Sequence, residues 1–135
     1  MSYGSELHTQ LSGYSALTAL VGSRIYPRQA RQPTSAPYLV LEKVSDVPFN
    51  SHQGYSHLRR IRQQVSVYVK TDDSAEAVVA QLKLAMEAWP AANSSVQMCM
   101  MLEDYGLLEE EAANPDGSGQ SLLHNPVDFL VYYAD

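Results

Sequence analysis

Residues 61–89 read IRQQVSVYVKTDDSAEAVVAQLKLAMEAW, and this stretch decides the fold because its hydrophobic period changes along it. Over Ile61–Lys70 apolar and polar residues alternate, which predicts a strand with one face in a core. Farther on, an apolar stripe recurs at three- and four-residue spacing, which predicts a helix. Asp73 and Glu76 have the spacing of a capping box at its start. The stripe contains Ala75, Val78, Val79, Leu82, Ala85, Met86 and Trp89.

The same patterns predict elements on both sides of this stretch. They are a helix over about Ser5–Val21 with Gly22 as its cap, a very short strand at 24–26, a buried strand over Tyr38–Val44, and two more strands over Val96–Leu102 and Val127–Tyr133. Consecutive strands favour antiparallel pairing. We therefore expect an α+β fold, with a mainly antiparallel sheet of four to five strands and two helices packed on one face.

Length and composition favour a single domain over residues 1–135. The chain is 45% hydrophobic and has one cysteine, so we expect a core that needs no disulfide or metal. Polar segments near residues 46–58 and 106–125 are expected to be mobile loops. Neither a signal peptide nor a membrane span is expected, which favours synthesis in the cytoplasm.

Candidate catalytic and metal-binding residues are few. His52 and His57 share a loop without Cys or Asp at ligand spacing, so polar loop histidines are favoured over a zinc site. Cys99 lies in an apolar strand and is expected to be a buried hydrophobe. Asp72 and Asp73 precede a helix, which favours capping over paired-carboxylate chemistry. No nucleotide-binding glycine pattern or nucleophile elbow is present, and the sequence predicts neither an enzyme nor a cofactor.

Charge is unevenly distributed along the chain. All nine Lys and Arg residues lie between Arg24 and Lys83, whereas nine acidic residues and no basic ones follow Lys83. Arginine and tyrosine together are typical of protein interfaces, and arginine also binds phosphate. Three interpretations stay open: an uneven solvated surface, a protein interface, or a nucleic-acid-binding accessory protein that uses the Arg-rich middle region. A pI near 5.1 and the absence of known nucleic-acid-binding motifs weigh against the last.

Two segments carry a family resemblance. LTALVGSRIYPRQARQPTSAPYLVLEKVSD (17–46) and RRIRQQVSVYVKTDDSAEAVVAQLKLAM (59–86) resemble the tail completion proteins of long-tailed bacteriophages, also called tail terminator or tail-to-head joining proteins. The shared pattern is a helix ending in Val-Gly, then Arg-Ile-Tyr-Pro, a proline-containing gap, Pro-Tyr with an apolar strand, and a strand of the R-x-Q-V-x-V-Y type. The resemblance covers about residues 5–89.

The resemblance implies a structural virion protein at the tail-neck junction. Its subunits would assemble with one another as a hexameric ring on the tail tube protein, end tube growth, and dock a head-completion or connector protein. Genome DNA would pass through the lumen without specific binding. Neither catalysis nor a cofactor nor membrane contact is implied.

A ring built from heterologous contacts suits a chain with one basic and one acidic region. The proline-containing connector over residues 24–37 is expected to lie at an interface, the alternative being that its prolines only steer the chain from helix to sheet. The expected oligomer or partner interface contains Arg24, Tyr26, Arg28, Arg31, Arg59, Arg60, Arg62, Glu109, Glu110 and Glu111.

Overall fold

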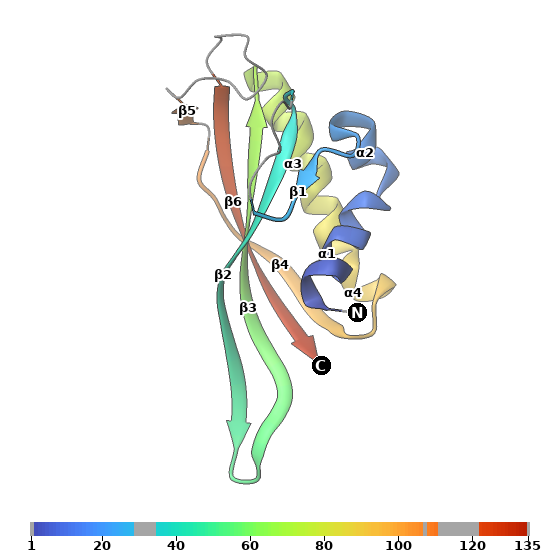
Figure 1. Ribbon diagram of the computed structural model, residues 1–135, viewed down its shortest axis with the longest axis vertical. Coiled ribbons are helices and arrows are strands. Elements are labelled where there is room, and N and C mark those ends of the chain that lie inside the picture. Colours follow the sequence, from blue (N-terminus) through green and yellow to red (C-terminus); the bar gives the residue numbers. More distant parts are fainter. Residues whose placement is uncertain (1, 29–34, 107, 111–121, 135) are drawn as a thin grey trace.

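The computed structural model describes residues 2–28, 35–106, 108–110 and 122–134 (Figure 1). Its helices are α1 (Tyr3–Ser12), α2 (Ser15–Val21), α3 (Asp72–Glu87) and α4 (Trp89–Ala92) in the described ranges. Its strands are β1 (Ile25–Tyr26), β2 (Tyr38–Ser51), β3 (Gly54–Val69), β4 (Val96–Asp104), β5 (Leu108–Glu110) and β6 (Leu122–Ala134).

The strands form one six-stranded sheet in the order β1-β2-β3-β6-β4, with β5 also paired to β6. β1 runs parallel to β2, and the remaining pairs are antiparallel. The helices lie against one face of the sheet (Figure 1). The predicted α+β class and one-sided helix layer are confirmed, although the described part has six strands and four helices rather than the predicted four to five strands and two helices.

The core lies between the sheet and the helices. Alternate residues of β3 are fully buried against it, and so is the predicted stripe of α3 apart from the half-buried Val79. Burying each large apolar side chain contributes about 1.5–3 kcal/mol, so this interface is the main source of stability. The largest fully buried side chains include Trp89, Phe129, Leu7, Leu11, Leu17 and Leu82. Both predictions from residues 61–89, the strand and the helix, are confirmed.

The prediction of a single helix over Ser5–Val21 is wrong, because the helix is interrupted at Gly13 and Tyr14, between α1 and α2. Tyr14 is extended (φ −89°, ψ 100°). Leu11 and Leu17 are both fully buried. In one continuous helix their side chains would point about 120° apart, so the break lets both reach the core. Gly22 does end α2, with the positive φ of 61° that favours glycine.

The capping box predicted at Asp73 is also wrong. Thr71 is the N-cap of α3, and its hydroxyl accepts a hydrogen bond from the Ser74 amide at 3.1 Å. Asp72 and Asp73 instead lie in the first turn, where the partial positive charge of the helix N-terminus favours carboxylates.

The loop predicted near residues 46–58 is replaced by strand. β2 and β3 continue beyond the rest of the sheet as a projecting ribbon (Figure 1), with a turn between Ser51 and Gly54. β6 follows β3 only as far as the pair Leu58–Ala134, so the tip is two-stranded. Irregularities in β2 lie at Lys43–Ser45 and Pro48–Asn50. We call residues 44–60 the hairpin arm.

The loop predicted near residues 106–125 is also replaced by strand, but only in part. Residues 108–110 form β5, and residues 122–125 belong to β6. Pairing of β5 with the first residues of β6 supplies the backbone hydrogen bonds that a loop would lack. Residues 107 and 111–121 lie outside the described residues. Mobility in both segments stays a prediction.

Candidate assembly surfaces

Arg24 holds the two ends of the connector together within the subunit, and its predicted place at an interface stays a prediction. Its side-chain Nε donates to the Pro37 carbonyl at 3.0 Å, and its own carbonyl accepts from the Leu39 amide at 2.9 Å. Tyr26 is half-buried and meets the Tyr38 ring edge-on, with 6.1 Å between the ring centroids. Both residues therefore fix the ends of the connector. Arg31 lies outside the described residues.

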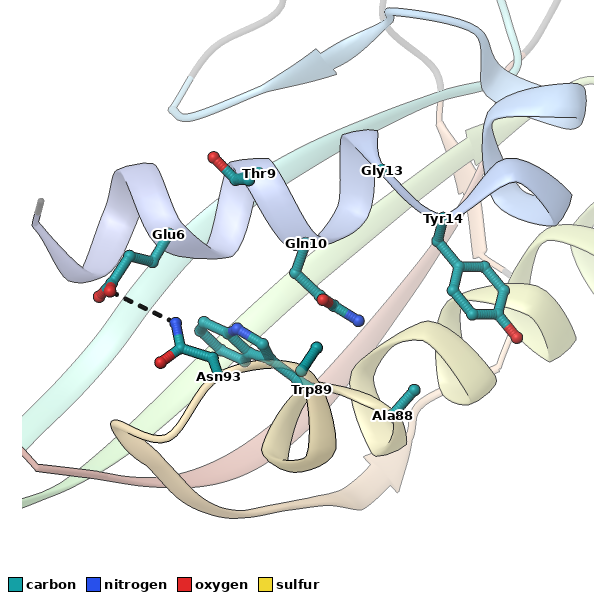
Figure 2. A pocket seen from close by; sticks show the side chains of 9 residues that line it. Glu6, Thr9, Gln10, Gly13, Tyr14, Ala88, Trp89 and Asn93 are labelled. Atoms are coloured by element: carbon teal, nitrogen blue, oxygen red, sulfur yellow. Dashed lines mark hydrogen bonds between the residues drawn. The ribbon is translucent and has the colours of Figure 1, made fainter.

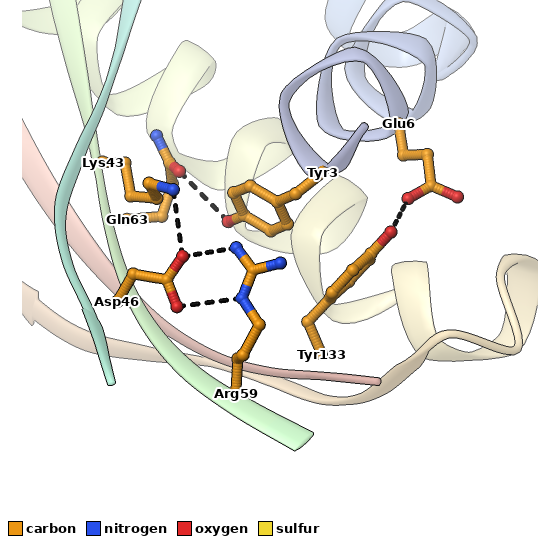
Figure 3. A network of polar contacts seen from close by, with 7 residues as sticks. All are labelled: Tyr3, Glu6, Lys43, Asp46, Arg59, Gln63 and Tyr133. Atoms are coloured by element: carbon orange, nitrogen blue, oxygen red, sulfur yellow. Dashed lines mark hydrogen bonds and ion pairs between the residues drawn. The ribbon is translucent and has the colours of Figure 1, made fainter. Parts of the chain in front are cut away.

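Arg59 belongs to an ion cluster at the base of the hairpin arm, on the face of the helices (Figure 3). One edge of its guanidinium binds the Asp46 carboxylate, with Nε donating to Oδ1 at 3.0 Å and Nη2 donating to Oδ2, and Lys43 Nζ lies 3.0 Å from Oδ2. The hydrogen bond from Arg59 is the main reason that the pKa of Asp46 is lowered. Arg59 also lies 5.6 Å from the centre of the Tyr133 ring. The cluster ties β2 to β3 where the arm leaves the body.

Buried polar groups continue from this cluster toward α1. The Tyr3 hydroxyl donates to Gln63 Oε1 at 3.0 Å, which gives the carbonyl oxygen of this buried side chain of β3 a partner (Figure 3). Burial raises the pKa of Tyr3, so this phenol stays protonated. Tyr133 donates its hydroxyl to Glu6, whose other oxygen accepts from Asn93 Nδ2 at 3.3 Å. These bonds anchor α1 to the sheet.

A cavity of about 510 Å³ opens beside this network. Its wall includes Tyr3, Gln63 and three cationic side chains, Arg28, Lys43 and Arg59. Asp46 already engages two of those cations, and Arg28 is exposed at the rim. The sequence predicted Arg28 as an interface residue, and its exposure leaves it available for that role.

The helix layer has a second cavity, of about 400 Å³, between α1 and the α3–α4 turn (Figure 2). Gln10 Nε2 donates across it to the Ala85 carbonyl at 2.8 Å, and Trp89 forms part of its wall. Glu6 is its one carboxylate and already binds Asn93 and Tyr133. The polar groups of this cavity thus connect α1 to α3, to the end of α4 and to the sheet.

Arg62 lies on the open face of the sheet, opposite the helices. Its Nε and one terminal nitrogen donate to Asp128 Oδ2 at 2.9 and 2.6 Å. Asp128 is almost fully buried and also accepts from the Tyr105 hydroxyl at 2.8 Å and Gln64 Nε2 at 3.1 Å. The hydrogen bond to this carboxylate raises the pKa of Arg62 and of Tyr105. Arg62 therefore neutralises an internal acid.

Arg60 differs from Arg59 and Arg62 in its contacts. It is exposed on the open face, and the structure records no ion pair for it within the described ranges. Glu109 and Glu110 lie in β5, opposite Leu123 and Leu122 of β6, and Glu111 lies outside the described residues. The three predicted arginines of β3 are thus divided between both faces of the sheet, and Arg24, Arg59 and Arg62 have partners within the subunit.

Sequence reasoning missed the apolar side chains of the arm. Val44, Val47, Phe49 and Tyr55 are 50%, 42%, 37% and 37% exposed. The signal was weak because Val47 and Phe49 alternate with polar residues or proline over only a few positions. Their exposure on a projecting ribbon marks a surface suited to contact.

Cys99 is buried as predicted, and burial raises its pKa to about 12, so it is a thiol at neutral pH. No group of three potential metal ligands exists in the described ranges, which include His52 and His57. None of the described helices is both long and apolar enough to cross a membrane.

Comparison with known proteins places the chain among phage tail components. The family model described as tail completion protein gp17 matches residues 5–112, a longer stretch than the segments that carry the resemblance. A chain in the virion of a native gene transfer agent (GTA) particle has a similar fold, with a TM-score of 0.73 over 99% of this chain and 96% of that chain. Their sequences are 15% identical, so this likeness concerns the fold. No curated protein matches the sequence.

Proposed function

Since the chain belongs to the tail completion protein gp17 family of structural tail proteins, we propose that it caps the tail tube of a phage-like particle as a closed ring. The ring, a hexamer in this proposal, ends tube growth and joins the tube to a head-completion or connector protein at the tail-neck junction. DNA passes through its lumen without sequence-specific contacts. The role requires binding surfaces and no catalysis.

The observation that carries this proposal is the hairpin arm. The tip of the arm is two-stranded and projects from the body (Figure 1), and a two-stranded ribbon is marginally stable by itself in water. Phe49 and Tyr55 are exposed on or next to this tip, and Val44 and Val47 are exposed nearer the body. A neighbouring subunit that covered those side chains would stabilise both the arm and the assembly. Contact between an arm and a different surface of the next copy is heterologous, and such contacts close into rings when the rotation between subunits allows.

The charged residues support the proposal in two ways. Three arginines have partners inside the subunit and stabilise its own structure: Arg24 at the connector, Arg59 at the base of the arm and Arg62 on the open face. Arg28 and Arg60 are exposed, and we assign them to subunit or partner contacts. Complementary charge at such contacts mainly selects the partner and the register.

Light scattering of the purified protein, alone and mixed with tail tubes, tests the proposal. We expect a closed oligomer at high concentration or on the tubes. A matched variant replaces residues 49–58 with Asn-Gly, which supports a two-residue hairpin turn. It should keep the thermal melt of the wild type, because the removed ribbon contributes little to the core, but should lose assembly. Strict monomers of the wild type under both conditions would refute the proposed ring.

A further inference from the structure

The hairpin arm presents a specific combination of side chains on the open face. Phe49 lies beside Tyr132 with 6.0 Å between ring centroids, yet remains 37% exposed. Val47 lies opposite Arg60 in the β2–β3 register, and both are exposed. The base of the arm therefore offers an apolar patch with one positive charge at its edge.

The opposite edge of the same sheet offers the complement. β4 is the terminal strand of the sheet order, with only β6 as a partner within the described part of the chain. Met100 and Leu102 of β4 are 44% and 47% exposed, and the adjacent Glu103 is exposed too. An exposed apolar edge strand can pair with another chain through its free backbone N–H and C=O groups.

Arg60 and Glu103 are charges with no ion-pair partner recorded in the described ranges, in contrast to Arg59 and Arg62. They do not reach each other within one subunit. Arg60 lies opposite Tyr132 and Glu103 opposite Asp128 on β6, four residues apart along the strand and one strand to either side. Strand geometry puts their Cα atoms about 16 Å apart, beyond the combined reach of the two side chains.

We propose that the hairpin arm of one copy packs on β4 of the next copy, with Val47 and Phe49 against Met100 and Leu102 and with Arg60 paired to Glu103. The occupant is a second copy because both halves of a complementary contact, in apolar area and in charge, are present on one chain and are too far apart to meet within it. Arm and edge are different surfaces, so the contact is heterologous and propagates around a ring. This inference rests on the proposed ring.

Charge reversal tests the pairing. Arg60→Glu places two carboxylates together at every contact, and Glu103→Arg places two guanidiniums together. Each single variant should raise the apparent dissociation constant of assembly about tenfold or more. The double variant restores opposite charges and should return within about threefold of the wild type. Lys83→Glu and Glu76→Arg, exposed on α3, are the matched reversals away from the contact and should leave assembly unchanged.

Mixing the two single variants sharpens the test. In an alternating ring with an even number of subunits, each arm then meets an edge of opposite charge, so an equimolar mixture should assemble at lower concentration than either variant alone. A folding defect is not repaired by mixing, and circular dichroism melts of each variant verify the fold separately. Single variants that assemble like the wild type, or variants that neither combination nor mixing restores, would overturn the contact while leaving the ring intact. Wild-type protein that never assembles would overturn both.

Discussion

The hydrogen bond between Tyr3 and Gln63 permits a quantitative test of how the helix layer is attached to the sheet. Tyr3→Phe removes the donor and leaves Gln63 Oε1, on a side chain only 2% exposed, without its 3.0 Å partner. An unsatisfied buried acceptor costs about 1–3 kcal/mol. Both residues border the cavity of about 510 Å³, from which water can partly replace the lost hydroxyl. Because that water offsets part of the cost, we expect the free energy of unfolding to fall by about 1–1.5 kcal/mol, the lower part of this range.

The double variant identifies the cause of that loss. Gln63→Met leaves the Tyr3 hydroxyl without its acceptor and should cost a similar amount. With both partners apolar, no polar group is left unsatisfied, so Tyr3→Phe/Gln63→Met should cost clearly less than the two single losses together, with a coupling energy of about 1 kcal/mol. Urea unfolding with an unchanged slope supplies the values. Losses that simply add would show that the two groups do not depend on each other, and this reasoning would fail.

Three further predictions concern single side chains. Thr71→Ala should lower the free energy of unfolding, measured in urea, by about 1 kcal/mol, and Asp73→Ala should lower it by less. A larger loss for Asp73→Ala would indicate that Asp73, and not Thr71, is the N-cap of α3. Cys99 should resist a thiol reagent in the native protein and react on denaturation, because its pKa is raised to about 12; rapid native reaction would contradict its burial. The pKa of Asp46 is depressed by Arg59, so its stabilising contribution is complete above the ordinary value of 3.8 and is lost as pH falls through the lower folded-state pKa. Asp46→Asn should remove that part of the acid dependence of stability, and an unchanged dependence would contradict the pairing.

Residues 61–89 were predictable because burial imposes their period. One face of β3 and one stripe of α3 meet in the core. Their apolar residues therefore recur every second residue in the strand and every three or four residues in the helix. The same reasoning failed at Tyr14, where the break between α1 and α2 depends on how two short helices each reach the core. It failed again in the hairpin arm, since a ribbon exposed on both faces needs no alternation of buried and exposed residues.

The candidate site was less predictable than the fold because its charge pairs are set by strand register. Arg59 meets Asp46 only because β2 and β3 pair through the arm, and Arg62 meets Asp128 across 66 positions of sequence. The sequence indicated the arginines as interface candidates but did not separate those with partners inside the subunit from those exposed on its surface. The register makes that separation for the arginines of β3 and leaves Arg60 exposed.

Electron microscopy of tail tubes incubated with the purified protein tests the central claim most directly. The account predicts ring-shaped density, closed around an open lumen, at one end of each tube, and tubes that no longer lengthen once it is present. Tubes with bare ends that continue to lengthen in the presence of folded, monomeric protein would contradict it.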